Sequence, residues 1–345
     1  MLNQSTPTEF LLLGFSDVRE LQTLHFVVFL SIYLAALMGN VLLIITVLLD
    51  CHLHSPMYFF LVNLALSDVC YISTTIPKSL AVSLTNNQRI SFSGCVSQVF
   101  LVVTFAGVDL TLLTAMAYDR YVAIRHPLQY TLIMNKIACL WMAAASWIIS
   151  VLNAVMNTVN TFRLEFCDSH NIGQFFCDIP QLLNISCTRT FGNLILILAN
   201  AVILCSSSSL VIIVSYSYIF TTVLKIPSVQ ARYKAFSTCT PHLTVFGLFV
   251  STALFSYFRP NAWFSSSLDL LTAVFYTVLP PLMNPIIYSL RNKDIHTAVL
   301  KVLKTGISQT HFKKLSQRIP ANRAKEKMDS SLPGPMLGPP HYSGC

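Results

Sequence analysis

The stretch with the clearest chemical character is Met116–Tyr130, MAYDRYVAIRHPLQY, which ends a long hydrophobic run. It contains an acid–base pair, Asp119–Arg120, between two tyrosines, and the cluster Arg125–Pro127 follows directly. A charge pair at the end of a hydrophobic helix usually marks the point where the helix leaves a membrane. Two interpretations are open. The pair is either an interfacial anchor, with Arg120 reaching the headgroups, or a switch that holds one helix arrangement and breaks in another.

Two further acids, Asp68 and Asp109, lie well inside hydrophobic runs. A carboxylate at that depth should face the protein interior or water. One interpretation is a shared cation site, for Na⁺ in particular, because carboxylates are hard oxygen ligands. The other is a protonated or hydrogen-bonded pair that only joins two helices. Asn40, Ser67 and Asn284 are polar neighbours that could complete either network.

The sequence contains no catalytic constellation. It has no HExxH, P-loop, G-x-S-x-G or paired CxxC motif, and its nine histidines are scattered. None of them stands at metal-ligand spacing from a cysteine or an acid. His126 and His242 lie near the cytoplasmic ends of hydrophobic runs, where an interfacial role is expected. The sequence therefore predicts a protein that is not an enzyme and has no cofactor apart from the Na⁺ ion.

The composition is that of a protein that crosses a membrane several times. Hydrophobic residues make up 54% of the chain and charged residues 10%, against about 25% charged in soluble domains. Seven apolar runs are each long enough to span a bilayer. They are Leu24–Leu49, Met57–Ile76, Val96–Tyr118, Ile137–Val159, Leu194–Leu224, Ala235–Phe258 and Leu270–Leu290. The fold class is therefore an all-α membrane protein with a seven-transmembrane helix bundle.

Lysine and arginine set the expected orientation and domain order. With the N-terminus outside, most of them lie on the cytoplasmic side, ten of these between Arg291 and Lys327. The positive-inside rule thus predicts a plasma-membrane protein with an extracellular N-terminus and a cytoplasmic C-terminus. The expected parts are an extracellular N-terminus (1–23), the seven-span bundle (24–290), an amphipathic helix on the inner leaflet (291–304) and a disordered cytoplasmic tail (305–345).

Glycosylation and cysteine patterns agree with this orientation. Two N-x-S tripeptides fall outside, at Asn3 and Asn184, and predict glycosylation there. Four cysteines lie on the same side: Cys95, Cys167, Cys177 and Cys187. They allow three pairings, and a pairing that includes Cys95 would join the long loop before the fifth span to the third span.

The seventh span contains a predicted kink. Pro285 follows Asn284 and removes a backbone hydrogen bond, and Tyr288 lies one turn further on. This stretch is either a hinge or a site of close packing, because proline is tolerated in membrane helices.

The longer motifs carry a resemblance to the rhodopsin-like G-protein-coupled receptors, and specifically to the vertebrate olfactory receptors. It covers about Thr8 to Lys304. The motifs are Leu53–Leu61 (LHSPMYFFL), Met116–Tyr130, Ser215–Tyr216, Lys234–Leu243 (KAFSTCTPHL) and Pro281–Lys293 (PLMNPIIYSLRNK).

The resemblance implies roles for particular residues. Cys95 would pair with Cys177, and Cys167 with Cys187. Arg120 would leave Asp119 on activation to meet a G protein. The implied switch residues are Asp119, Arg120, Tyr121, Tyr216, Asn284, Pro285 and Tyr288. The Asp68–Asp109 pair would hold Na⁺. The partner would be a stimulatory, olfactory-type G protein that raises cyclic AMP, with membrane lipid around the bundle and no nucleic acid.

The chain departs from the family pattern at several positions. Arg125 stands where the family usually has cysteine, and Asp109 where it usually has glutamate. In the sixth span, Phe249–Ser251 (FVS) replaces the common Phe-Tyr-Gly and removes a tyrosine from the pocket floor.

The resemblance also gives a register for the ligand pocket. Its expected lining is Val102, Val103, Ala106, Gly107, Asn200, Leu204, Ala253, Tyr257 and Thr277. This mostly apolar wall with a few hydrogen-bonding groups suits a small, neutral, hydrophobic odorant. The alternatives are a rhodopsin-like receptor outside the olfactory group and a transporter or channel. The latter would show internal repeats and a charged path, and the sequence shows no internal repeat.

Overall fold

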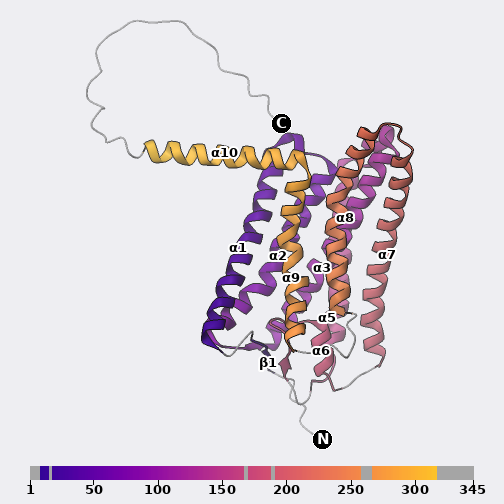
Figure 1. The fold of residues 1–345 in the computed structure, drawn as a ribbon. Coiled ribbons are helices and arrows are strands. Elements are labelled where there is room, and N and C mark those ends of the chain that lie inside the picture. Colours follow the sequence, from indigo (N-terminus) through magenta and orange to yellow (C-terminus); the bar gives the residue numbers. More distant parts are fainter. Residues whose placement is uncertain (1–7, 15–17, 167–169, 188–190, 258–265, 317–345) are drawn as a thin grey trace, which may run out of the picture.

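A computed structural model describes residues 8–14, 18–166, 170–187, 191–257 and 266–316, and this part of the chain is mainly helical. Long helices stand side by side as one bundle (Figure 1). They are α1 (Arg19–Leu49), α2 (Pro56–Thr85), α3 (Phe92–Arg125), α5 (Lys136–Phe162), α7 (Phe191–Leu224), α8 (Val229–Tyr257) and α9 (Ser266–Arg291). The predicted all-α membrane fold with a seven-helix bundle is confirmed.

Six of the described helices are long and apolar enough to cross a membrane, and α8 is the further member of the bundle. The first half of α8 is rich in charged and hydroxyl residues, which lowers its hydropathy. It nevertheless packs closely along α9 (Figure 1). The largest hydrophobic core lies between α2, α3, α5 and α9, and includes Leu61, Leu64, Leu112 and Met116.

The helices extend beyond the apolar runs of the sequence. The second run ends at Ile76, whereas α2 continues to Thr85 and ends at Asn86, whose backbone is left-handed with φ 54°. At the start of α3, the hydroxyl oxygen of Ser91 accepts a hydrogen bond from the N–H of Gly94 at 3.1 Å. Capping groups rather than a loss of hydrophobicity end these helices, so the apolar runs are shorter than the helices.

A small β-sheet covers one end of the bundle and was not predicted. It consists of β1 (Glu9–Leu12), β2 (Arg89–Ser91) and β3 (Asn171–Ile172) in the order β2-β1-β3. The central strand β1 pairs antiparallel with β2 and parallel with β3. Phe10 and Leu12 of β1 point into the protein and are buried. We call this end of the bundle, which also contains the short helix α6 (Ile179–Ile185), the sheet end.

The opposite end, which we call the α10 end, carries α10 (Figure 1). The short helix α4 (Tyr130–Ile133) packs on α3 at this end. Single turns of 3₁₀ helix, η1 (Cys51–Leu53) and η2 (Pro127–Gln129), also lie there.

Helix α10 (Lys293–Ser316) turns away from α9, passes the end of α1 and projects sideways beyond the bundle (Figure 1). Its Ile295 and Ala298 are buried against the bundle, as the expected amphipathic pattern requires. Its limits differ from the expected 291–304, because Arg291 belongs to α9 and the helix continues to Ser316. Gly306 is a possible stop signal just after 304, but the helix passes through it, and no proline follows until Pro320. Residues 317–345 of the expected tail lie outside the described residues.

Helix α1 replaces the hydrogen bond that Pro285 removes from α9, whereas the kink itself stays a prediction. Pro285 has no N–H, so the carbonyl of Pro281, four residues earlier, lacks its usual helical donor. The side-chain N–H of Asn40 donates to this carbonyl at 2.8 Å. Gly39 allows the approach, because a Cβ there would stand 3.0 Å from a ring carbon of Pro285. The sequence of α1 therefore accommodates the proline of α9 and fixes the two helices together.

Candidate functional site

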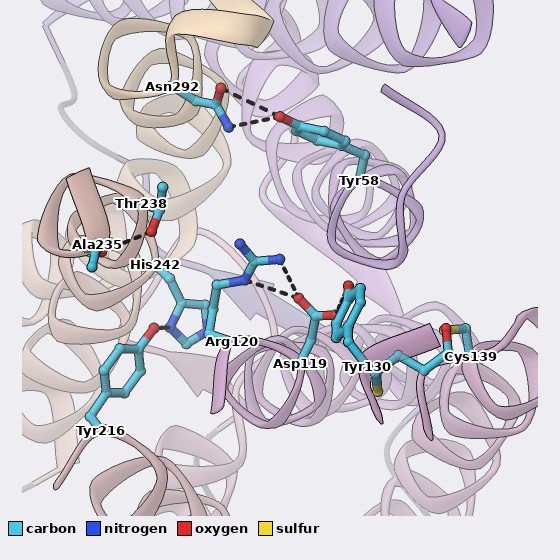
Figure 2. Close-up of polar contacts among 11 residues, drawn as sticks. Tyr58, Asp119, Arg120, Tyr130, Cys139, Tyr216, Ala235, Thr238, His242 and Asn292 are labelled. Carbon is cyan, nitrogen blue, oxygen red and sulfur yellow. Dashed lines mark hydrogen bonds and ion pairs between the residues drawn. The ribbon is translucent and has the colours of Figure 1, made fainter. Parts of the chain in front are cut away.

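Asp119 and Arg120 lie in the last turns of α3 at the α10 end, and Tyr130 of α4 completes what we call the lock (Figure 2). Arg120 donates to Oδ2 of Asp119 from Nη2 at 2.5 Å and from Nε at 2.9 Å. The hydroxyl of Tyr130 donates to Oδ1 of Asp119 at 2.7 Å. Both carboxylate oxygens are thus engaged. The side chain of Asp119 is fully buried and that of Arg120 is 16% exposed, so the ion pair is shielded from water.

A role for Tyr130 was not predicted from the sequence, although Tyr130 is the last residue of the motif Met116–Tyr130. The motif gave no sign that α4 folds back under the end of α3. Burial raises the pKa of Tyr130, and the neighbouring Asp119 carboxylate raises it further. The phenol therefore keeps its proton at neutral pH and remains a donor to Asp119.

A second polar contact at this end joins α3, α7 and α8 through His242 (Figure 2). Its Nε2 lies 2.8 Å from the carbonyl oxygen of Leu113, and its Nδ1 lies 2.8 Å from the hydroxyl of Tyr216. A carbonyl can only accept, so Nε2 carries the proton and Nδ1 accepts from Tyr216. The rings of Tyr216 and His242 also stack, with centroids 5.6 Å apart.

The expected interfacial role of His242 is therefore wrong. Its side chain is only 1% exposed, and it is a buried link between three helices. The signal was present in the sequence, because an ionisable side chain inside an apolar helix usually has a specific partner.

The remaining expected switch residues lie in the same half of the bundle. The ring of Tyr121 packs on Tyr218 of α7, with centroids 5.8 Å apart. Tyr288 is fully buried, and its hydroxyl has no hydrogen-bond partner among the described residues. Asn284 lies one turn before Tyr288 on α9 and contacts Asp68.

The two interior acids lie on the neighbouring helices α2 and α3 inside the bundle. Asp68 of α2 and Asp109 of α3 are both buried and close enough to interact electrostatically. Asn284 donates from Nδ2 to Oδ2 of Asp68 at 2.9 Å. Within the described residues, Oδ1 of Asp68, Oδ1 of Asp109 and Oδ1 of Asn284 have no hydrogen-bond partner. Ser67 lies beside them and donates to the carbonyl of Phe105 at 3.3 Å. Three unpartnered buried oxygens form a donor set that fits a hard cation.

No cluster of three or more histidines, cysteines or acids that could hold a metal ion is found in the described part of the chain. A cation at the interior acids would therefore be held by two carboxylates together with amide and hydroxyl oxygens.

The sheet end contains the disulfide between Cys95 and Cys177 that the resemblance implies, with the Cα atoms 5.5 Å apart. It joins the loop after α5 to the first turn of α3. Cys167 lies outside the described residues, so its pairing with Cys187 stays a prediction. Asn184 has an exposed side chain on α6 at this end, whereas Asn3 lies outside the described residues.

The expected pocket residues fall in different surroundings. Val103 packs on the hydrophobic cluster at the sheet end, whereas Val102 and Ala106 pack in a cluster between α1, α2, α3 and α9. Gly107 instead faces α5, because a Cβ there would stand 3.1 Å from Cβ of Ser150. This close packing places Gly107 in the contact between α3 and α5 rather than in a pocket wall, and it corrects the register for that residue.

The remaining residues of the expected pocket also lie in different surroundings. Thr277 is fully buried and donates to the carbonyl of Ala273 in its own helix at 2.7 Å. Asn200 of α7 has a buried Nδ2 without a hydrogen-bond partner among the described residues. Leu204 is half-buried one turn away. The side chains of Ala253 and Tyr257 lie outside the described part of the structure.

Comparison with known proteins decides the family. Residues 29–305 match the family model described as olfactory receptor. The chain belongs to the olfactory receptor family. It is 51% identical to human olfactory receptor 14A16 over 309 residues, which cover 90% of this chain and 100% of the relative. Human olfactory receptor 14C36 is 49% identical over 88% of this chain and 97% of its own length. Olfactory receptor 1G1 of the gorilla is 45% identical over 87% of this chain and 96% of its own length.

The olfactory receptor is thus an odorant receptor of the G-protein-coupled class, a multi-pass plasma-membrane protein and not an enzyme. Odorant ligands and G-protein coupling follow from the family. The lock, the His242 link and the interior acids are then the parts of the receptor with chemistry suited to a switch.

The α10 end of the receptor also presents exposed groups beside the lock. Leu128, in η2, is 98% exposed. Arg125, the departure from the family pattern, donates from Nη1 to the hydroxyl oxygen of Thr222 on α7 at 3.0 Å.

Proposed function

We propose that the receptor binds a small, mostly hydrophobic odorant within its helix bundle and activates a stimulatory, olfactory-type G protein that raises cyclic AMP. The observation that carries this proposal is the lock of Asp119, Arg120 and Tyr130, which lies beside the exposed Leu128 and at the opposite end of the bundle from the disulfide. A ligand near the sheet end and a protein at the α10 end would then act on the same set of helices.

The proposed orientation puts the sheet end outside and the α10 end in the cytoplasm. The segments at the α10 end carry Arg125, Lys136, Lys225, Arg232 and Lys301, which the positive-inside rule places on the cytoplasmic side. The disulfide at the other end suits the oxidising exterior. The N-terminus is then extracellular and the C-terminus cytoplasmic.

The proposed ligand site lies between α3, α7, α8 and α9 toward the sheet end. Val102, Val103, Ala106 and Leu204 would supply apolar contact, together with Ala253 of α8, and Tyr257 of α8 would add a hydrogen-bonding group. The unpartnered Nδ2 of Asn200 is the best candidate for a polar anchor, since a buried donor without an acceptor is stabilised when a ligand supplies one. A neutral ligand with one hydrogen-bond acceptor matches this arrangement.

The mechanism is a two-state equilibrium that ligand and G protein bias in the same direction. In the closed state Asp119 accepts hydrogen bonds from Nε and Nη2 of Arg120, so the guanidinium is held at Asp119 rather than turned toward a partner. Opening the α10 end requires Arg120 to leave Asp119, and it requires α7 and α8 to change their contact through Tyr216 and His242. An odorant that fits the open arrangement better shifts the population toward it.

The hydroxyl of Tyr130 is expected to stabilise the closed state, so Tyr130→Phe should raise basal signalling. A hydrogen bond to a charged acceptor contributes about 1.5–3 kcal/mol, and 1.4 kcal/mol corresponds to a factor of ten, so basal activity should rise by roughly tenfold. Cyclic AMP per surface receptor without agonist measures the effect. Tyr233→Phe is the matched control, because the side chain of Tyr233 on α8 is 74% exposed. Equal basal activity in Tyr130→Phe and wild type would contradict a locking role.

The interior acids are proposed to hold a Na⁺ ion that favours the closed state. Asp68, Asp109 and Asn284 would coordinate it through the three oxygens that lack a hydrogen-bond partner in the described part of the chain. The ion would offset one of the two negative charges of the buried carboxylates, which otherwise repel each other.

We expect NaCl to lower agonist potency in wild type relative to choline chloride at the same ionic strength, by roughly threefold to tenfold for a coupling of about 1 kcal/mol. In Asp68→Asn the difference should disappear, because one carboxylate is lost. Agonist concentration–response curves in isolated membranes measure this. If NaCl lowers agonist potency equally in wild type and in Asp68→Asn, the two acids do not bind Na⁺. The Asp68–Asp109 pair would then only link α2 to α3.

The experiment that tests the proposed function is a ligand screen with a cyclic AMP readout, in cells that carry an odorant-receptor trafficking factor. Volatile odorants should activate the receptor, whereas amines and peptides should not. Activation by amines or peptides alone would favour a rhodopsin-like receptor with another ligand class. Ion flux through the purified protein in liposomes would favour a transporter or channel instead.

A further inference from the structure

The loop segment Phe175–Asp178 enters the bundle from the sheet end. Phe175 is 2% exposed and Phe176 is fully buried, in a cluster that includes Tyr71 of α2 and Ala273 of α9. The segment therefore forms part of the closed sheet end rather than lying on the surface above it.

On one side, the segment is fixed to α3. The disulfide joins Cys177 to Cys95, and the side-chain oxygen of Gln98 accepts a hydrogen bond from the backbone N–H of Cys177 at 2.8 Å. Gln98 in turn donates from Nε2 to the carbonyl of Thr74 on α2 at 3.0 Å. This attachment includes a covalent bond and is permanent under oxidising conditions.

On the other side, the segment is held by α9 through Asp178. Oδ2 of Asp178 accepts a hydrogen bond from the hydroxyl of Tyr276, and Oδ1 accepts from the N–H of Ile179 at 2.9 Å, at the start of α6. The ring of Phe176 packs edge-on against Tyr276, with centroids 6.0 Å apart. The carboxylate is buried, with Asp178 only 4% exposed. Unlike the disulfide, this attachment can break and reform.

We propose that Asp178 and Tyr276 form a proton-sensitive latch that holds the segment Phe175–Asp178 closed over the sheet end of the bundle. Opening the latch frees the segment from α9 while the disulfide keeps it tethered to α3. The latch is a positioning device for the ligand chamber. A closed latch should also slow the release of a bound odorant, and this consequence rests on the proposed function. The existence of the latch does not depend on the proposed function.

The groups around Asp178 define its response to pH. Among the described residues, the titratable side chains placed against Asp178 are the phenols of Tyr276 on α9 and Tyr71 on α2, and a phenol ordinarily loses its proton only near pH 10. α1 contributes the ring of Phe29, which packs on Phe175. α3 contributes the disulfide cysteine and Gln98, and α6 contributes no titratable side chain. Asp178 is therefore the group on which proton binding at this site depends.

Burial raises the pKa of Asp178 to about 6, although the hydrogen bonds from Tyr276 and Ile179 lower it. In the open form the carboxyl group meets water, and its pKa returns to roughly 3.9. The closed form thus binds a proton more tightly. This contribution to the closed form is complete below about pH 4 and is lost as the pH rises through 6. Acidification from pH 7.5 to 5.5 should shift the equilibrium toward the closed form by about fourfold.

Hydrogen exchange of the backbone amides of residues 175–187 tests the latch. The purified receptor in lipid nanodiscs, without ligand, is measured at pH 7.5 and 5.5, and the rates are normalised to the intrinsic exchange rate at each pH. In wild type, normalised exchange should be about fourfold slower at pH 5.5. Tyr276→Phe should exchange faster than wild type at pH 7.5, because the carboxylate loses a donor while the ring contact with Phe176 remains.

Asp178→Asn is the decisive variant, because it keeps the shape and removes the proton-binding group. Its normalised exchange should be the same at both pH values. Glu9→Gln changes another acid at the sheet end, in the exposed pair with Arg89, and should keep the wild-type pH response. Equal normalised exchange of wild type at both pH values overturns the proposal, as does a wild-type pH response in Asp178→Asn. If Asp178→Asn does not fold, the wild-type profile and Tyr276→Phe decide. The experiment needs no odorant and no G protein. A negative result would therefore refute the latch without refuting the proposed signalling, and a failure of the proposed signalling would not refute the latch.

Discussion

Replacing Arg120 with alanine is expected to abolish agonist-dependent G-protein activation while leaving the receptor at the cell surface. The guanidinium is the cationic member of the lock and the group that would turn toward the G protein once it leaves Asp119. Without it the α10 end loses the charged contact that couples opening to partner binding. Agonist-stimulated cyclic AMP should fall to the level of cells without receptor, a loss of at least tenfold if the contact contributes 1.5–3 kcal/mol.

Arg120→Ala leaves the buried carboxylate of Asp119 without its ion-pair partner, so a second variant is needed to separate loss of signalling from loss of stability. Removing one member of a buried ion pair destabilises a protein by about 3–5 kcal/mol, because the remaining charge is uncompensated. The double variant Asp119→Asn with Arg120→Ala removes both charges and should restore any lost surface expression. It should still fail to signal.

Arg125→Ala is the matched control for loss of positive charge at the same end. Arg125 is exposed and bonds to Thr222, so its loss should reduce signalling far less than loss of Arg120. A wild-type agonist response in Arg120→Ala would contradict the mechanism. An equal loss in Arg125→Ala would show that overall surface charge, rather than the lock, controls coupling.

Loss of the disulfide between Cys95 and Cys177 is expected to remove most of the receptor from the cell surface. The two residues are separated by 82 positions. A closed loop of this length contributes about 4.5 kcal/mol in the chain-entropy estimate, an upper bound here because helices persist in the membrane when the loop is freed. The disulfide also fixes the buried Phe175 and Phe176, so its loss should loosen the whole sheet end. Surface expression should fall several-fold or more.

Variants of the two cysteines separate the bond from the thiols. Cys95→Ala, Cys177→Ala and the double variant each break the same bond, so all three should lose surface expression to the same extent. Cys205→Ala is a control at an exposed free cysteine in α7 and should be expressed as wild type. Labelling of intact cells with an antibody to an N-terminal tag measures the effect. Additive losses in the double variant would mean that each cysteine acts through separate packing.

The helices were predictable because a bilayer demands long apolar runs, and the chain has them. Their ends were not, since caps such as Ser91 and Asn86 lie in polar sequence. The sheet was missed because strands of two to four residues carry no readable alternation. Its partners also come from three distant segments, which only the folded bundle brings together.

The chemistry of the switch was only partly visible in the sequence. Asp119 and Arg120 are adjacent in the chain, so their pairing could be read directly. His242 and Leu113 are separated by 129 positions, and Asn40 and Pro281 by 241, and no local pattern links such pairs. Gly107 was wrongly expected to line the ligand pocket. Its lack of a side chain instead allows Ser150 of α5 to approach α3.

The most direct test of the central claim, that ligand and G protein act on one switch, is a reciprocal binding measurement. It uses the purified receptor in nanodiscs, an odorant found in the screen and the nucleotide-free stimulatory G protein. The G protein should tighten odorant affinity, and the odorant should tighten G-protein affinity by the same factor, because the two sites share one coupling free energy. With typical couplings of about 1–3 kcal/mol, that factor should lie between roughly fivefold and 150-fold, and Arg120→Ala should abolish it. An odorant affinity that the G protein leaves unchanged in wild type would contradict the account.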